Sequence, residues 1–200
     1  MTKYIIGVDE VGRGPLAGPV MVAAVLIPRQ LRLTKIKNGG RTLGLRDSKK
    51  YTALGREVWF NYIDNHPHIS YALSTVSAGV IDRVNIARAT NIAATRAVKR
   101  LIDHQNVEKK KCNILLDGSL SLLDDSLDYR VIIRGDEKIN AIKLASIVAK
   151  VKRDRKMVRF HSIYSCYAFD EHKGYGTKKH QKAIKKYGPS RIHRLTFIKG

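Results

Sequence analysis

Four carboxylates are the residues of this sequence best placed to do chemistry. Asp9 and Glu10 follow the apolar run YIIGV, Asp117 follows NILL, and Asp136 follows RVIIRG. Each run has the length of a strand, so we expect the acids at the ends of neighbouring strands. Carboxylate oxygens without clustered cysteine or histidine suit Mg²⁺ or Mn²⁺ rather than zinc. The pattern predicts a site for divalent cations.

Turn chemistry is the alternative explanation for two of these acids. Asp117-Gly118 and Gly135-Asp136 are common turn dipeptides. Asp9 and Glu10 differ, because adjacent side chains on an extended segment point to opposite faces and one of them must face the core. A buried carboxylate is costly unless it is paired or bound to a metal. Two ions about 4 Å apart can drive phosphodiester displacement. The acids therefore indicate a metal-dependent phosphodiesterase.

The charge of the chain indicates what it binds. Its 38 Lys and Arg residues outweigh 17 Asp and Glu residues, which gives a net charge of +21. Lysine and arginine bind nucleic acid by releasing the counterions condensed on its phosphates. A ribosome-associated basic protein would fit the charge equally well. Acids within so basic a chain favour a metal site that acts on a polyanion.

Location and assembly are also expectations at this point. The opening MTKYIIGVDE lacks the features of a secretion signal, and no apolar run approaches the ~18 residues that a membrane span needs. Cys112 and Cys166 form no CxxC pair, so we expect buried free thiols. We expect a cytoplasmic protein that does not bind membranes and is a monomer.

Hydrophobic periodicity predicts the elements that must position the acids. In chain order we expect strands at 4–8 and 20–27, a basic loop at 28–50, a helix at 53–65 capped by Thr52, a strand at 69–77, a helix at 79–102, strands at 113–116 and 129–134, and helices at 140–160 and after 172. Strands that alternate with helices predict an α/β fold with a mixed sheet. No linker divides the chain, so we expect one domain over 1–200.

The opening GVDEVGRGPLAGPVMVAAVLI closely resembles ribonuclease HII, the type 2 ribonuclease H family. The match continues in order through LRDSKK at 45–50, ILLDGS at 114–119, RGDEKIN at 134–140, ASIVAKVKRDR at 145–155, HKGYGT at 172–177 and YGPSRIHR at 187–194. The resemblance implies a ribonuclease H-like fold, with a five-stranded mixed sheet flanked by helices and a helical C-terminal part over about 161–200.

The resemblance also implies an activity. Members of this family are endonucleases that cleave the RNA strand of RNA–DNA hybrids and nick 5′ of single ribonucleotides embedded in duplex DNA, leaving 5′-phosphate and 3′-hydroxyl ends. Two Mg²⁺ or Mn²⁺ ions would be held by Asp9, Glu10, Asp117 and Asp136. The expected partners are RNA–DNA hybrid and ribonucleotide-containing duplex DNA, and the expected process is ribonucleotide excision or primer removal.

Two further motifs are expected to recognise the ribonucleotide. Gly12-Arg13-Gly14 lets the backbone approach a ligand closely, although a tight turn between strands would also explain the glycines. In the family this motif reads the ribose 2′-hydroxyl, and Arg13 adds a phosphate contact. Tyr175, in HKGYGT, packs against the sugar that follows the ribonucleotide.

Basic residues in the matched blocks are expected to contact phosphates. Ser48, Lys49 and Lys50 would form a phosphate clamp, and Lys150 would lie near the backbone phosphates, with Asp154 as its support. Solvated charge and a helix-surface Lys150–Asp154 ion pair are the simpler explanations. His172 and His193 are assigned structural or phosphate-contacting roles.

Two other identities remain open. A ribonuclease HIII shares the acids but usually lacks the GRG motif and carries an extra N-terminal domain, whereas here the Asp-Glu pair begins at residue 9 with GRG intact. A non-catalytic nucleic-acid-binding protein would explain the charge, but it would gain nothing from acids that face phosphates. The departures EKINAIKLAS and HRLTF from the usual family pattern leave the four acids untouched.

Overall fold

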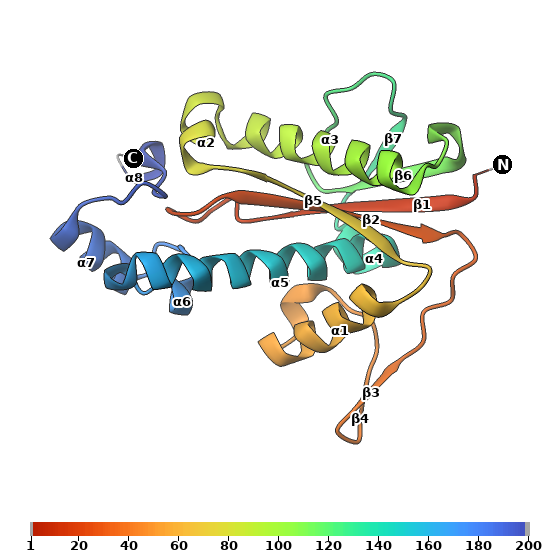
Figure 1. The fold of residues 1–200 in the computed structure, drawn as a ribbon, viewed down its shortest axis with the longest axis horizontal. Helices are drawn as coiled ribbons and strands as arrows, with labels where there is room; N and C mark the ends of the chain where they lie inside the picture. Colours follow the sequence, from red (N-terminus) through yellow and green to blue (C-terminus); the bar gives the residue numbers. More distant parts are fainter. Residues whose placement is uncertain (1, 199–200) are drawn as a thin grey trace.

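A five-stranded mixed sheet lies at the centre of the molecule, between two layers of helices (Figure 1). The structure, a computed structural model, describes residues 2–198 and, at positions 38 and 41, the backbone alone. The strands are β1 (Tyr4–Val11), β2 (Val20–Pro28), β5 (Ser70–Val76), β6 (Cys112–Asp117) and β7 (Tyr129–Ile132). Their order is β5-β2-β1-β6-β7, with β1 antiparallel to β2 and parallel to β6. The predicted mixed sheet is confirmed.

Helices cover both faces of this sheet. On one face lie α2 (Ala78–Val84) and α3 (Ile86–Gln105), and on the other lie α1 (Ala53–Asn65) and α5 (Asn140–Ile163) (Figure 1). Strand β2 is buried on both sides, because its alternate residues point to opposite faces. Val22 and Ala24 join the apolar core under α3, whereas Ala23 and Val25 join the core under α5. Among residues 2–198, no helix combines the length and apolar composition that crossing a bilayer requires.

Strand β1 is longer than the sequence predicts, and this places two of the acids inside the sheet. It continues three residues past Val8, and Asp9 and Glu10 pair with Ala23 and Val22 of β2. Asp9 is only 5% exposed. The apolar pattern ends at Val8, but the backbone ladder does not, since the hydrogen bonds of a strand are independent of its side chains.

Three other predictions need correction. The helix expected over 79–102 is two helices, broken at Asn85, whose φ of 65° is left-handed and whose side chain caps α3 by accepting from the amide of Arg88. The loop expected at 28–50 contains the short strands β3 (Ile36–Asn38) and β4 (Arg41–Leu43) and the 3₁₀ turn η1 (Ser48–Lys50). Cys112 is buried as expected, but Cys166 is exposed.

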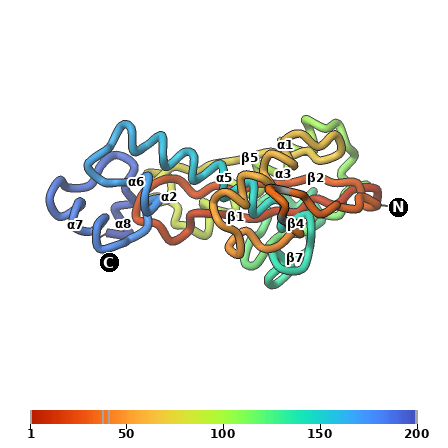
Figure 2. The backbone as a smooth tube through the Cα atoms, turned by 90° about the horizontal axis from the view of Figure 1, so that it is seen from below, coloured from red at the N-terminus to blue at the C-terminus, as the bar shows by residue number. Residues whose placement is uncertain are grey.

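The C-terminal section lies at one end of the elongated molecule (Figure 2). Its elements are the turn η3 (Ser165–Tyr167) and the helices α6 (Phe169–His172), α7 (Lys178–Tyr187) and α8 (Leu195–Ile198). Residues of η3, α6 and α7 share a small apolar cluster with Ala17 and Met157, whereas Phe197 of α8 packs against the core under α3. A β-bridge joins Ala17 to His193. The section therefore packs directly on residues 12–19, which connect β1 to β2 and are called the 12–19 loop below. The remaining elements are η2 (Lys109–Lys111) and α4 (Gly135–Lys138).

Candidate active site

The four acids lie at the same edge of the sheet. Asp9 and Glu10 are on β1, Asp117 ends the neighbouring parallel strand β6, and Asp136 lies in the first turn of α4, just after β7. Oδ1 of Asp117 accepts hydrogen bonds from the amides of Gly135 at 2.6 Å and of Asp136 at 3.3 Å. These bonds tie the end of β6 to the start of α4, so two acids that are 19 residues apart become neighbours.

Burial and mutual repulsion raise the pKa values of Asp9, Glu10 and Asp117. Burial, followed by the charges of Glu10 and Asp117, raises the pKa of Asp9 well above its ordinary value. Burial also raises the pKa of Glu10, against the opposing effect of Arg13. Burial and the charge of Asp136 raise the pKa of Asp117. A cation bound among these groups would relieve all of these costs.

The donor set fits a divalent cation. Oε2 of Glu10 is buried and has no hydrogen-bond partner within residues 2–198. Leaving such an acceptor unpaired costs about 1–3 kcal/mol or more, which an ion would offset. All four groups supply hard oxygen ligands, as Mg²⁺ and Mn²⁺ prefer. In the described part of the chain, no three acidic, histidine or cysteine side chains converge closely enough to hold an ion as they stand. An ion that binds all four groups would therefore have to draw the acids closer together.

A pair of buried serines supports Asp9 from the α5 side. The Ser146 hydroxyl favours the ionised Asp9 carboxyl, which lowers the pKa of Asp9 against the larger effect of burial, and it lies 2.8 Å from the Ser48 hydroxyl. Both serines are 4% exposed. Ser48 therefore lies under the acid cluster, and its hydroxyl is committed to Ser146 instead of facing solvent. Sequence reasoning missed Ser146, although a serine within the buried run of ASIVAK is a signal of such a polar contact.

The lysines beside Ser48 lie at the rim of the acid cluster. Nζ of Lys49 is 3.1 Å from Oδ2 of Asp136, and its side chain is 79% exposed. Lys50 is exposed. Asp47 holds the turn by accepting from the amide of Lys49 at 2.9 Å. On α5, Lys150 forms the expected ion pair with Asp154 at 2.9 Å.

The structure explains glycine at only one of the two glycine positions of the GRG motif. Gly12 has a φ of +88°, and a Cβ there would come within 2.2 Å of Nε of Arg153, so the fold itself requires glycine. Gly14 is exposed, has no left-handed φ, and a Cβ there would meet nothing within 4 Å. Nothing within residues 2–198 therefore requires glycine at position 14. The Arg13 guanidinium lies 2.9 Å from the Ser119 hydroxyl and 3.6 Å from Glu10.

Tyr175 lies beside the GRG motif although 161 residues separate Tyr175 from Gly14 (175 − 14). The amides of Leu16 and Ala17 donate to the carbonyl of Gly174 at 2.9 and 3.3 Å, which joins the two segments. The Tyr175 ring is 42% exposed and stands 5.9 Å from the Arg153 guanidinium. The structure thus brings an exposed aromatic ring next to the 12–19 loop.

The histidines of the C-terminal section are internal. His193 is 3% exposed, and its Nε2 lies 3.0 Å from Nε2 of the buried His180. The His172 ring stacks on that of His180, and its Nε2 lies 2.7 Å from the carbonyl of Tyr167. His193 therefore has a structural role, and no phosphate reaches it.

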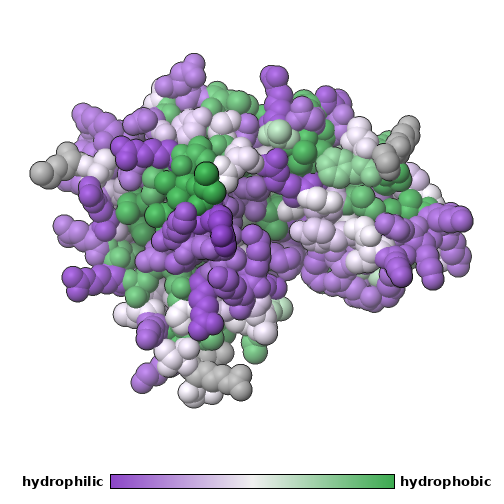
Figure 3. Space-filling view, turned by 180° about the vertical axis from the view of Figure 1, so that it is seen from behind, coloured by the Kyte–Doolittle hydropathy of each residue, from purple (hydrophilic) through white to green (hydrophobic). Residues whose placement is uncertain are grey.

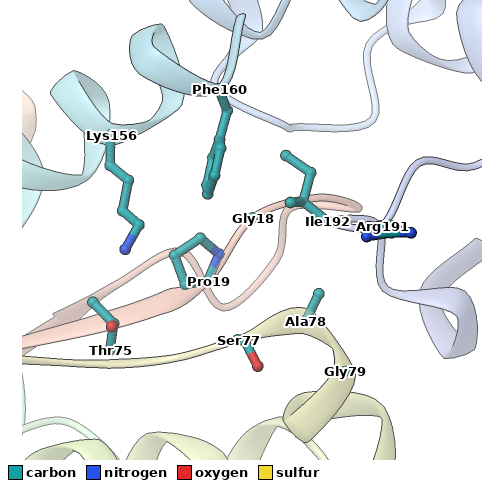
Figure 4. Close-up of a pocket in the computed structure, with 10 residues that line it drawn as sticks. All are labelled: Gly18, Pro19, Thr75, Ser77, Ala78, Gly79, Lys156, Phe160, Arg191 and Ile192. Atoms are coloured by element: carbon teal, nitrogen blue, oxygen red, sulfur yellow. The ribbon is translucent and has the colours of Figure 1, made fainter. Parts of the chain in front are cut away.

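A separate cavity of about 320 Å³ lies between the 12–19 loop, the end of β5, the start of α2, α5 and the C-terminal section (Figure 4). Lys156 and Arg191 bring charge to it, and Pro19, Phe160 and Ile192 supply apolar walls. None of its lining residues is an acid or a histidine.

The face seen from behind carries hydrophilic side chains across its centre (Figure 3). We place the candidate active site at the four acids, because only they offer ligands and charge for phosphoryl chemistry.

Comparisons with known proteins identify the family of this chain. The family model described as Ribonuclease HII matches residues 6–200. The ribonuclease HII of Caldicellulosiruptor bescii is 43% identical over 98% of this chain and 87% of its own length, and that of Bacillus subtilis is 38% identical over 98% and 69%.

Solved structures show the same fold. The ribonuclease H2 of Pyrococcus horikoshii has a TM-score of 0.70 at 22% identity, over 98% of this chain and 95% of its own. A Bst-RNase HIII in complex with Mn²⁺ has a TM-score of 0.69 at 15% identity, over 99% of this chain and 68% of its own. These two likenesses concern the fold alone, whereas the family model and the curated relatives match the sequence as well. The chain therefore belongs to the ribonuclease HII family of metal-dependent ribonucleases, which cleave the RNA strand of RNA–DNA hybrids.

Proposed function

We propose that this enzyme also nicks duplex DNA on the 5′ side of a single embedded ribonucleotide, using two divalent ions. The observation that carries the proposal is Gly14, an exposed glycine that the fold does not require, in a loop that follows Asp9 and Glu10 directly. A position without a side chain lets the backbone approach a ribose closely. The 2′-hydroxyl is the group that separates a ribonucleotide from the surrounding DNA.

The acids would carry the reaction. When bound by Asp9, Glu10, Asp117 and Asp136, two Mg²⁺ or Mn²⁺ ions would activate the attacking water and stabilise the leaving oxygen. The water oxygen bonds to phosphorus, the P–O3′ bond breaks, and the 3′ oxygen takes up a proton. The products carry a 5′-phosphate and a 3′-hydroxyl. Ser146 and the amide of Gly135 hold Asp9 and Asp117 in place during this exchange.

Basic residues would hold the strand across this site. Lys49 would leave Asp136 and pair with a substrate phosphate, and Lys50 would extend the contact. Arg13 and Lys150 lie at the rim, where phosphates would pass, each already near an acid at 3.6 and 2.9 Å. Ser48 would not contact a phosphate itself and would instead support Asp9 through its hydrogen bond with Ser146. Tyr175 would pack against the sugar that follows the ribonucleotide, since its exposed ring lies next to the 12–19 loop.

A labelled DNA duplex that carries one ribonucleotide tests the proposal. It is incubated with Mg²⁺, Mn²⁺ or EDTA beside an all-DNA duplex and a long RNA–DNA hybrid. A metal-dependent nick 5′ of the ribonucleotide, absent from the all-DNA control, supports the proposal. Cleavage of the hybrid without that nick would overturn the junction specificity and indicate the substrate preference expected of a ribonuclease HIII. Binding without any cleavage would overturn the catalytic assignment.

A further inference from the structure

Two of the arginines whose side chains the structure describes are completely buried. Arg153, on α5, and Arg194, just before α8, are both 0% exposed, although arginine is rarely buried unless it is paired. The arginine ion pairs within residues 2–198 involve Arg13, Arg134 and Arg155 instead. The two buried guanidiniums therefore have partners of another kind.

Their partners are backbone carbonyls, most of which belong to the 12–19 loop. Arg194 donates to the carbonyls of Gly12 at 2.5 Å, Arg13 at 2.7 Å and Gly18 at 3.0 Å. Arg153 donates to the carbonyls of Pro19 at 3.2 Å, Ala17 at 3.3 Å and Lys173 at 3.0 Å. Five of these six carbonyls lie in the loop, and the sixth lies two residues before Tyr175.

Binding three carbonyls at once requires the planar guanidinium of arginine, which presents several N–H donors in a fixed geometry. Burial, together with the charge of Arg153, lowers the pKa of Arg194 to about 10, so the group stays charged at neutral pH. Hydrogen bonds from a charged donor are about twice as strong as neutral ones and offset part of the cost of burial. A lysine presents one ammonium and cannot reach three carbonyls in a plane.

These bonds decide which way the loop presents its amides. In a trans peptide the carbonyl of one residue and the amide of the next point in opposite directions. Since Arg194 draws the carbonyls of Gly12 and Arg13 inward, the amides of Arg13 and Gly14 turn away from it. Neither amide donates to a backbone carbonyl elsewhere in residues 2–198. They are the donors that a ribose 2′-hydroxyl would meet.

We infer that Arg194 and Arg153 are positioning residues for ribonucleotide recognition. Arg194 sets the two peptides of the GRG motif, and Arg153 locks the loop to the segment that carries Tyr175. Neither touches the substrate. The inference rests on the proposed function, because it assumes that the 12–19 loop reads the ribonucleotide.

The test is a double-mutant cycle with Gly14→Ala. Arg194→Lys keeps the charge and should lower single-turnover cleavage of the single-ribonucleotide duplex by about tenfold or more. If Arg194 acts through the loop, the double variant should be within about twofold of the slower single variant. Arg100→Lys is the matched control, since Arg100 is exposed and donates to one carbonyl, that of Leu73, at 3.0 Å. It should cut at the wild-type rate.

One further readout and two safeguards separate positioning from general damage. The rise in melting temperature on adding Mn²⁺ should be the same in wild type and Arg194→Lys, because the acids are intact. All rates are measured well below each variant's melting temperature. If Arg194→Lys does not fold, Arg194→Gln removes the buried charge and takes its place in the cycle. The inference would be overturned if the rate loss of the double variant equalled the product of the two single losses. It would also be overturned if Arg194→Lys cleaved at the wild-type rate. A wild type that does not nick the duplex would overturn the proposed function instead.

Discussion

Nζ of Lys49 lies 3.1 Å from Oδ2 of Asp136, so a cation of the chain itself pairs with an oxygen of the proposed metal site. The lysine side chain is 79% exposed, while that of Asp136 is 8% exposed. Because the lysine end of the pair lies in solvent, water screens the attraction, and the pair is weaker than a fully buried one. Lys49 can therefore yield to an ion or to a substrate phosphate at little cost.

Replacing this lysine should separate metal binding from substrate binding. In Lys49→Met, Asp136 has lost its lysine partner, so half-maximal activity should need about twofold to fivefold less Mn²⁺, because the ion no longer competes with Lys49 for Asp136. The KM for hybrid should rise, because a phosphate contact is gone. Metal titrations at saturating hybrid and substrate titrations at saturating metal measure the two effects. An unchanged KM would argue against the phosphate role of Lys49.

Asp9→Asn should abolish cleavage and still stabilise the fold. The folded-state pKa of Asp9 is raised, so the carboxyl costs stability that begins above its unfolded pKa of about 3.9 and is fully present above the folded pKa. The neutral amide removes the cost, while its oxygen can still accept from the amide of Glu10. We expect cleavage to fall by about 100-fold or more, with a higher melting temperature in EDTA. Hybrid binding by gel shift should persist. Cleavage near the wild-type rate would show that the metal site is misassigned.

The two glycines of the GRG motif should respond in opposite ways to alanine. Gly12→Ala should lower the melting temperature, because the new Cβ meets Arg153 and φ is left-handed. Gly14→Ala should leave the melting temperature unchanged, because the space around position 14 is open. It should nevertheless slow cleavage at a single ribonucleotide by about tenfold or more, since a methyl group would stand between the backbone and the ribose. Thermal melts and single-turnover cleavage decide this, and wild-type cleavage by Gly14→Ala would remove the main support for junction reading.

Tyr175→Ala should affect substrates unequally. Loss of the ring should slow nicking at a single ribonucleotide more than it changes the Mn²⁺-induced rise in melting temperature, because the ring lies beside the 12–19 loop and not among the acids. Tyr187→Ala, at another exposed tyrosine of the C-terminal section, is the control and should behave as wild type. Equal rate losses on single-ribonucleotide duplex and long hybrid would argue against a role at the junction.

The histidine cluster predicts that the fold weakens in mild acid. Burial, followed by the neighbouring His180, lowers the pKa of His193 to about 4, against about 6.5 in an unfolded chain. Between these values the unfolded state binds more protons, so stability should fall as the pH drops from about 6.5 to 4. Melting temperatures across this range measure the slope for wild type and for His193→Gln. The difference between them cancels the opposite contribution of Asp9. Equal slopes would show that His193 does not carry the effect.

Local chemistry determined much of this protein. Helix α1 runs from Ala53 to Asn65 with Thr52 as its cap, as predicted, because a capping hydroxyl and a helical repeat act within a few residues. The four acids were identifiable because each follows a strand-length apolar run. The break between α2 and α3 at Asn85 was not identifiable from the sequence. The apolar stripe continues past Asn85, and the chain turns there because of a single left-handed φ angle.

Only the tertiary structure decided what supports those acids and the loop beside them. The Ser48–Ser146 hydrogen bond joins residues 98 apart, and the bond from Arg194 to Gly12 joins residues 182 apart. An arginine in HRLTF and one in KVKRDR read from the sequence as surface charge. They are buried because the packing of α5 and the C-terminal section against the 12–19 loop leaves carbonyls that helix and sheet do not satisfy, and a buried carbonyl requires a donor.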